Sequence, residues 1–178
     1  MEANFLQNLA LVLHLQGKAD EAARTYREAI AIRQKDVGEN HSDYASDIAG
    51  LAGTLVDIGD FDEASSLFHR AIAIHTKTLG AENSALADDY LGLAKLLLKR
   101  GEHDEAENFG LKALNIHRAA LGKDHPAVAQ DLLFLSHCLG VKGDSTTNNG
   151  CFPRISNNQS RSRNLRRKAY AIFLRRLV

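Results

Sequence analysis

The stretch Leu51–Ala64, LAGTLVDIGDFDEA, decides the fold because it has two close copies elsewhere in the chain. Forty-two residues earlier, Leu9–Ala22 reads LALVLHLQGKADEA, and 42 residues later, Leu93–Ala106 reads LAKLLLKRGEHDEA. All three copies open with Leu-Ala, carry a glycine at the ninth position and close with Asp-Glu-Ala. Self-similarity at a fixed period of this length is typical of solenoids and other repeat architectures.

Each repeat predicts two helices. In the second copy a helix is expected over residues 43–57, because its apolar positions fall at i, i+3, i+4 and i+7: Ile48, Leu51, Ala52 and Leu55. Gly59 ends this helix, and a second helix is expected from Asp62, as its capping residue, to Leu79. Over the whole repeat region the pattern predicts seven antiparallel helices.

Small and aromatic residues predict how the two helices meet. Alanines recur in phase at the expected crossings: Ala10, Ala22 and Ala29, then Ala52, Ala64 and Ala71, then Ala94, Ala106 and Ala113. Tyr26 and Phe68 fill the space around them, whereas the third copy has Gly110 at that position. We expect the neighbouring Phe109 or Leu111 to compensate for the missing ring only in part.

These alanines, with the aromatic at Tyr26, have the internal spacing of the tetratricopeptide repeat (TPR). The 42-residue period and the segment 121–129, LGKDHPAVA, resemble the kinesin light chain type of that repeat. The resemblance covers residues 4–143 and implies an all-α, right-handed superhelical solenoid of about three and a half repeats. We therefore expect residues 1–143 to form the solenoid and residues 144–178 a separate tail.

The resemblance also implies that the first helix of each repeat lines a concave, peptide-binding groove. By position, the groove residues would be Asn4, Gln7, Asn8, Leu11, His14, Ser46, Asp57, Asp88, Leu91, Lys95, Lys99, Gln130 and His137, with Ala49, Gly50, Gly53, Gly92 and Leu133 beside them. Related chaperone-binding modules hold a C-terminal carboxylate with Lys, Arg and Asn, and this chain has Gln, Leu, Gly or Asp there, so that ligand is not expected. Kinesin light chains carry a ladder of asparagines that contacts peptide backbone. Only Asn8 matches it, the equivalents being Gly50, Gly92 and Phe134.

Charge divides the chain. The formal net charge is zero, but residues 1–144 carry −8 and residues 145–178 carry +8. We expect residues 145–160 to be disordered and the basic tail to be disordered or weakly helical. Three readings stay open: a poorly ordered or out-of-frame end, a basic helix that caps the acidic solenoid, and a nuclear-import, nucleic-acid-binding or anionic-lipid-binding segment.

Catalysis and metal binding are not expected. The repeated Asp-Glu pairs are explained as helix-start residues. The eight histidines show no His-x-x-x-His spacing, and we interpret His75 and His117, one repeat apart, as surface or inter-repeat residues. Cys138 lies beside His137 but has no orienting third group, so we expect it to pack as a small helix residue. No cofactor motif is present, and we expect no enzyme, no metal and no cofactor.

The composition predicts a cytoplasmic protein. The first residues lack the features of a secretory signal, no apolar run is long enough to span a membrane, and two cysteines are too few for a disulfide framework. The predicted function is a non-enzymatic scaffold that binds a partner peptide or helix, which near Lys95 and Lys99 would carry an acidic segment. The alternatives are a kinesin-light-chain-like cargo adaptor and a fragment of a larger sensor or signalling protein. Nucleic acid or anionic lipid bound by the tail is the least favoured partner.

Overall fold

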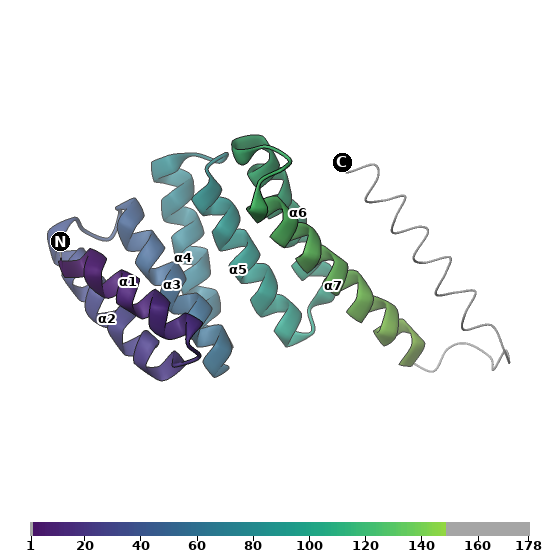
Figure 1. Ribbon diagram of the computed structural model, residues 1–178, viewed down its shortest axis with the longest axis horizontal. Helices are drawn as coiled ribbons and strands as arrows, with labels where there is room; N and C mark the ends of the chain where they lie inside the picture. The colour runs from purple at the N-terminus through teal and green to yellow at the C-terminus, as the bar shows by residue number, and fades with distance from the viewer. Residues whose placement is uncertain (1, 149–178) are drawn as a thin grey trace, which may run out of the picture. The chain divides into compact units, whose positions relative to one another are not determined.

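The computed structural model describes residues 2–148, with side chains described as far as Val141. These residues form seven helices, which are α1 (Glu2–Leu15), α2 (Ala19–Asp36), α3 (Ser42–Ile58), α4 (Phe61–Leu79), α5 (Ser84–Arg100), α6 (His103–Leu121) and α7 (Pro126–Asn148). Residues 2–148 contain no strand. The seven helices and the all-α repeat architecture predicted from the 42-residue period are confirmed (Figure 1).

The helices stack in pairs. Within a repeat α1 packs on α2, α3 on α4 and α5 on α6, and the repeats join where α2 meets α3 and α4 meets α5. The odd-numbered helices also touch one another directly, α1 with α3 and α3 with α5. This stacking, within the compact unit Met1–Val141, places the first helix of each repeat along one side (Figure 1).

Helix ends follow the predicted glycines. Gly59 and Gly101 end α3 and α5 with φ values of 97° and 83°, a left-handed conformation that glycine adopts without a Cβ clash. The predicted cap of α4 is wrong by two residues. Asp60, not Asp62, accepts a hydrogen bond from the backbone N–H of Glu63, because the helix already begins at Phe61.

The alanines at the predicted crossings form the closest packing of the core. All nine are fully buried, with 0% of their surface exposed: Ala10, Ala22, Ala29, Ala52, Ala64, Ala71, Ala94, Ala106 and Ala113. A methyl side chain lets two helix backbones approach closely, and larger residues such as Leu51, Leu55 and Leu93 fill the space around the crossings.

A glycine and an aromatic ring share each junction between a second helix and the next first helix. A Cβ atom on Gly50 would lie 2.6 Å from the Tyr26 ring, and one on Gly92 would lie 2.5 Å from the Phe68 ring. At the third junction the residues are exchanged, so that a Cβ on Gly110 would lie 2.9 Å from the ring of Phe134.

The expectation that Phe109 or Leu111 compensates at Gly110 is therefore wrong. Phe134 supplies the ring from the opposite helix, α7, whereas Phe109 stacks on Tyr90 with 5.7 Å between ring centroids. Each junction thus keeps one ring and one glycine, and only the helix that donates the ring changes.

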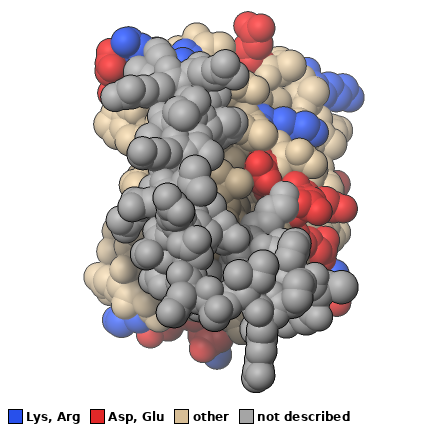
Figure 2. Space-filling model, turned by 90° about the vertical axis from the view of Figure 1, so that its right-hand side faces the viewer, with Lys and Arg blue, Asp and Glu red and all other residues tan. Residues whose placement is uncertain are grey.

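The last helix extends further than expected. The sequence predicts its end near Val141 and a loop from Ser145, but α7 continues through Gly143 to Asn148. The expectations for residues 149–178, including their disorder or weak helicity, lie outside the described residues. On the described part of the face shown in Figure 2, a group of acidic side chains lies beside basic ones.

Candidate functional site

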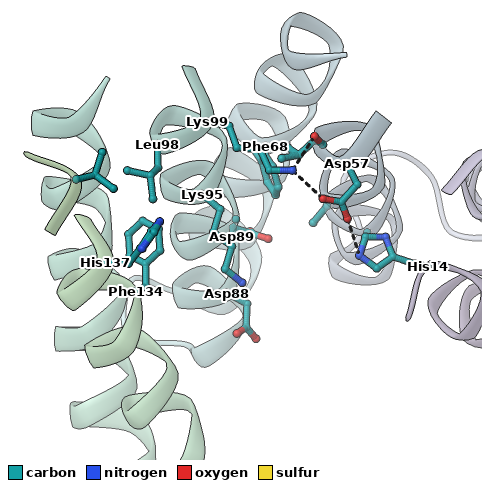
Figure 3. A pocket seen from close by; sticks show the side chains of 16 residues that line it. His14, Asp57, Phe68, Asp88, Asp89, Lys95, Leu98, Lys99, Phe134 and His137 are labelled. Carbon is teal, nitrogen blue, oxygen red and sulfur yellow. Dashed lines mark hydrogen bonds and ion pairs between the residues drawn. The ribbon is translucent and has the colours of Figure 1, made fainter. Parts of the chain in front are cut away.

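A groove of about 770 Å³ follows the first helices of the repeats. Its walls come from α1, α3, α5 and α7, and α4 contributes one ring from below (Figure 3). The lining residues are His14, Ala49, Gly50, Gly53, Val56, Asp57, Phe68, Asp88, Asp89, Gly92, Lys95, Leu98, Lys99, Phe134, His137 and Val141.

The floor of the groove is apolar and contains little side chain. Gly50 and Gly92 lie over the rings of Tyr26 and Phe68, so the rings occupy the space where larger side chains would stand. Gly53 differs, because a Cβ atom added there would meet nothing within 4 Å. The floor is therefore formed by backbone and aromatic rings, with open space above Gly53.

One end of the groove is closed by a network of paired charges. Lys99 donates hydrogen bonds from Nζ to the Asp57 carboxylate at 2.9 Å and to the backbone carbonyl of Val56 at 3.2 Å. Asp57 also lies 3.5 Å from His14 Nε2, and His14 Nδ1 bonds to the Thr54 hydroxyl at 2.8 Å (Figure 3). These groups satisfy one another, which leaves little net charge at this end.

The other end combines apolar side chains with unpaired basic groups. Leu98, Phe134 and His137 lie close together here, and Lys95 stands between this cluster and the charged network (Figure 3). Lys95 and His137 occupy the same position in neighbouring repeats, 42 residues apart. Within residues 2–141, neither of them forms an ion pair with an acidic residue, and Lys95 acts only at longer range on Asp88 and Asp131, where its charge opposes the pKa rise that burial causes.

Below the groove, each junction contains a buried cation or imidazole paired with an aspartate 14 residues later. Arg33 Nε donates to Asp47 at 2.8 Å in the first junction. In the next two, His75 Nδ1 lies 2.6 Å from Asp89 and His117 Nδ1 lies 2.7 Å from Asp131. All of these side chains are at least nine-tenths buried, so each pair replaces the solvation that both partners lose.

The surroundings of His75 favour its protonated form. Its Nε2 faces the carbonyl oxygen of Ser42 at 3.1 Å, and its Nδ1 faces the Asp89 carboxylate, so both ring nitrogens meet acceptors. Burial lowers the pKa of His75, but the hydrogen bond and charge of Asp89 outweigh it and the pKa is raised above its usual value. The histidines thus pair with aspartates across the junction and not with each other.

The third junction reaches the groove itself. His117 Nε2 lies 3.4 Å from the carboxylate of Asp88, which lines the groove, while the opposite ring nitrogen holds Asp131. One oxygen of Asp131 is buried without a hydrogen-bond partner among the described residues. Burial also raises the pKa of the Asp131 carboxyl.

Sequence position places about half of the predicted groove residues at the groove. His14, Asp57, Asp88, Lys95, Lys99 and His137 line it together with the predicted glycines. Asn4 and Gln7 instead hydrogen-bond to Arg33, and Ser46 to His75. Leu91 is buried in the core, and the remaining residues are exposed and do not line the groove: Asn8, Leu11, Gln130 and Leu133.

The groove also contains residues that position alone did not indicate. Phe68 comes from a second helix, and Val56, Leu98, Phe134 and Val141 complete its apolar part. A pattern that could have found the rings is the constant spacing of 24 residues between Tyr26 and Gly50, Phe68 and Gly92, and Gly110 and Phe134.

The described residues also bear on metal binding, on Cys138 and on membrane insertion. No group of three or more His, Cys, Asp or Glu side chains there is placed to hold a metal ion. Cys138 is 1% exposed and packs in the core, as predicted. None of the described helices has the length and apolarity needed to cross a bilayer.

Stacked helix pairs that recur every 42 residues, with a groove along their first helices, define a helical-repeat scaffold. The family model for the tetratricopeptide repeat matches residues 2–77, 44–119 and 90–145. The chain therefore belongs to the tetratricopeptide repeat family. A search of curated proteins gives no significant match.

Solved structures with the same fold include repeats of the kinesin light chain type. BtubC (BKLC) from P. vanneervenii is 20% identical over 88% of this chain and 68% of its own, with a TM-score of 0.70. A putative kinesin light chain from Podosopora anserina, with nearly identical TPR-like repeats, is 21% identical over 83% of this chain and 71% of its own, with a TM-score of 0.71.

The type III secretion translocator chaperone SycD of Yersinia enterocolitica is 18% identical over 79% of this chain and 85% of its own, with a TM-score of 0.57. At these identities the likeness concerns the fold. Membership of the tetratricopeptide repeat family supports a scaffold for protein interaction.

Proposed function

We propose that this solenoid binds a segment of a partner protein in the groove between α3, α5 and α7, and that an acidic side chain of the segment is held by Lys95 and His137. The observation that carries the proposal is the uneven pairing of charge along the groove. Lys99 is neutralised by Asp57, whereas Lys95 and His137 form no ion pair within residues 2–141.

Lys95 and His137 also stand next to apolar surface. Phe134, Leu98 and Val141 line the same end of the groove. A basic group beside an apolar patch recognises an acidic residue that is followed or preceded by a bulky apolar one, since burial of the apolar side chain supplies affinity and the charge supplies orientation. The sequence predicts that an acidic segment of the partner binds near Lys95 and Lys99, and we now propose Lys95 and His137 as its contacts.

The test is a selection from random displayed peptides on the full 178-residue chain, followed by affinity measurements on variants. Enriched peptides should contain Asp or Glu next to an apolar residue. Lys95→Glu should weaken their binding at least about tenfold, or roughly 1.4 kcal/mol. Lys123→Glu, the same charge change in the exposed turn before α7, should leave the affinity unchanged. Enriched peptides that bind both variants alike would refute the groove assignment.

The cargo-adaptor role and the role as part of a larger sensor stay predictions. The similarity to kinesin light chain repeats concerns the fold, and Asn8, the one residue that matches the asparagine ladder, is exposed and does not line the groove. No observation in the described residues favours either role over general partner binding.

A further inference from the structure

We infer that the segment bound in the groove is an amphipathic α-helix and not an extended peptide. The inference rests on the proposed function and narrows it to one kind of partner: a helix with one apolar face and an acidic residue at its edge. The argument starts from what the groove floor offers to a ligand backbone.

The floor offers almost no hydrogen-bonding side chains. Gly50, Gly53 and Gly92 have none, and the helical backbone beneath them is already paired within its own helices. The remaining floor is made of Phe68 and Phe134 with Val56 beside them. A ligand lying on this floor therefore meets carbon and ring surface.

Most polar side chains at the groove are already engaged. Lys99 and His14 hold Asp57, His117 approaches Asp88, and His75 holds Asp89. An extended backbone that bound through them would compete with pairs that the solenoid makes for itself. Within the described part of the chain, Lys95 and His137 form no ion pair with an acidic side chain. Two side chains at one end of the groove are too few to hydrogen-bond the alternating N–H and C=O groups of a long extended strand.

An extended segment would therefore bury unpaired amide groups against the floor. A buried amide without a partner loses its hydrogen bonds to water and gains none, which opposes binding. An α-helix satisfies its own backbone and presents only side chains, in apolar rows at i, i+3, i+4 and i+7. A helical ligand can therefore lie on an apolar floor without losing backbone hydrogen bonds, whereas an extended ligand cannot.

The shape of the groove agrees with this occupant. Aromatic rings fill the space beside Gly50 and Gly92 and give a flat floor, whereas the space above Gly53 is open. A groove of about 770 Å³ can receive the apolar side chains of a helix whose cylinder rests on the rims. Lys95 and His137 then face one edge of that cylinder, where an Asp or Glu completes the contact.

Two displayed libraries separate the helix from the extended peptide. One consists of random linear peptides, and the other randomises positions i, i+3, i+4 and i+7 on a helix of Ala, Glu and Lys. We expect the helical library to yield the tighter binders to the full-length chain, with apolar residues at the randomised positions. A proline placed in the middle of an enriched segment should weaken binding roughly tenfold or more.

Gly53→Leu provides the matching test on the solenoid. A Cβ atom at this position meets nothing within 4 Å, so we expect the leucine to extend into the open space of the groove. It should weaken an enriched helix roughly tenfold or more while the thermal midpoint stays equal or rises. Ala73→Leu, the same added bulk on the exposed face of α4, is the control and should not change binding.

The outcomes distinguish this inference from the proposed function. Enrichment from the linear library alone, or binders that tolerate the proline, would overturn the helix and leave the groove function standing. No enrichment from either library would overturn both. Helical binders that are indifferent to Gly53→Leu in a variant that still melts cooperatively would also overturn the inference, because their site lies elsewhere.

Discussion

Gly50→Ala and Gly53→Ala add the same methyl group to neighbouring turns of α3, and the structure predicts that Gly50→Ala is the less stable of the two. Both glycines are helical, so each substitution removes the entropic cost of glycine within a helix and gains about 0.5–1 kcal/mol. The surroundings differ. The new Cβ at position 53 meets nothing within 4 Å, whereas at position 50 it would lie 2.6 Å from two ring atoms of Tyr26 and 2.8 Å from its hydroxyl oxygen.

The ring of Tyr26 has little room to retreat, because this side chain is 4% exposed and belongs to the main core cluster. Overpacking of such a site costs about 1–3 kcal/mol. The helix-propensity gain is common to both variants, so the difference between them is the overpacking alone. For a domain of this size that difference corresponds to a separation of about 2–12 °C between the two thermal midpoints.

The assay is thermal and urea unfolding of both variants followed by circular dichroism. Gly53→Ala should melt slightly above the unmodified protein and Gly50→Ala below Gly53→Ala. A second pair made in a Tyr26→Leu background isolates the ring, since the gap between the glycine variants should shrink when the ring is absent. Equal midpoints for the two variants, or an undiminished gap without the ring, would refute the assignment of Tyr26 to the space above Gly50.

Three further predictions test the core, the junctions and the buried pairs. Ala71→Leu, at a fully buried helix crossing, should lower the free energy of unfolding by about 1–3 kcal/mol, whereas Lys77→Ala on the exposed end of α4 should change it little in the same urea titration. Exchanging ring and glycine as Phe68→Gly with Gly92→Phe should restore part of the stability that each single change removes, measured as a coupling energy in a double-mutant cycle, and an additive result would count against the shared space. Since the folded-state pKa of His75 lies above the unfolded value of about 6.5, its stabilisation is complete below that value and is lost as the pH rises through the folded pKa, about 1.4 kcal/mol for each unit of difference. His75→Arg should remove that loss, so unfolding free energies that depend equally on pH in the two proteins would contradict the pairing with Asp89.

Sequence periodicity predicted the helices well because each is punctuated by glycine and patterned by alanine and leucine in the same phase. The start of α4 was misjudged because Asp60 and Asp62 both precede the apolar stripe, and only the backbone geometry decides which carboxylate faces the open N–H groups. The end of α7 was misjudged for a related reason. Gly143, Ser145 and the following threonines have poor helix propensity, yet propensity alone did not stop the helix before Asn148.

The groove was harder to predict because its character depends on contacts between repeats. Position along the helix predicted that His14, Asp57 and Lys95 lie at a groove, and they line one. It could not show that Lys99 is held by Asp57 or that Asn4 and Gln7 hydrogen-bond to Arg33. Which charged groups remain available to a partner follows from side-chain pairing across helices. The repeat period predicts the position of a residue on its helix but not the side chains with which it pairs.

Two spacings in the sequence do record these contacts, and together they explain how unequal repeats stack equally. The 24-residue spacing joins a ring to a glycine, so exchanging the two at Gly110 and Phe134 conserves the filled volume. The 14-residue spacing joins a basic side chain to an aspartate, so exchanging Arg33 for histidine in later repeats conserves the pairing. A junction requires that the space beside the glycine is filled by a ring and that the buried aspartate is paired with a basic side chain. Which helix carries the ring, and whether the basic side chain is arginine or histidine, can vary. The arginine junction stays charged at every pH at which a protein folds, whereas His75 loses its proton as the pH rises through its raised pKa. The junction between α4 and α5, the helix that carries Lys95, therefore changes its charge with pH.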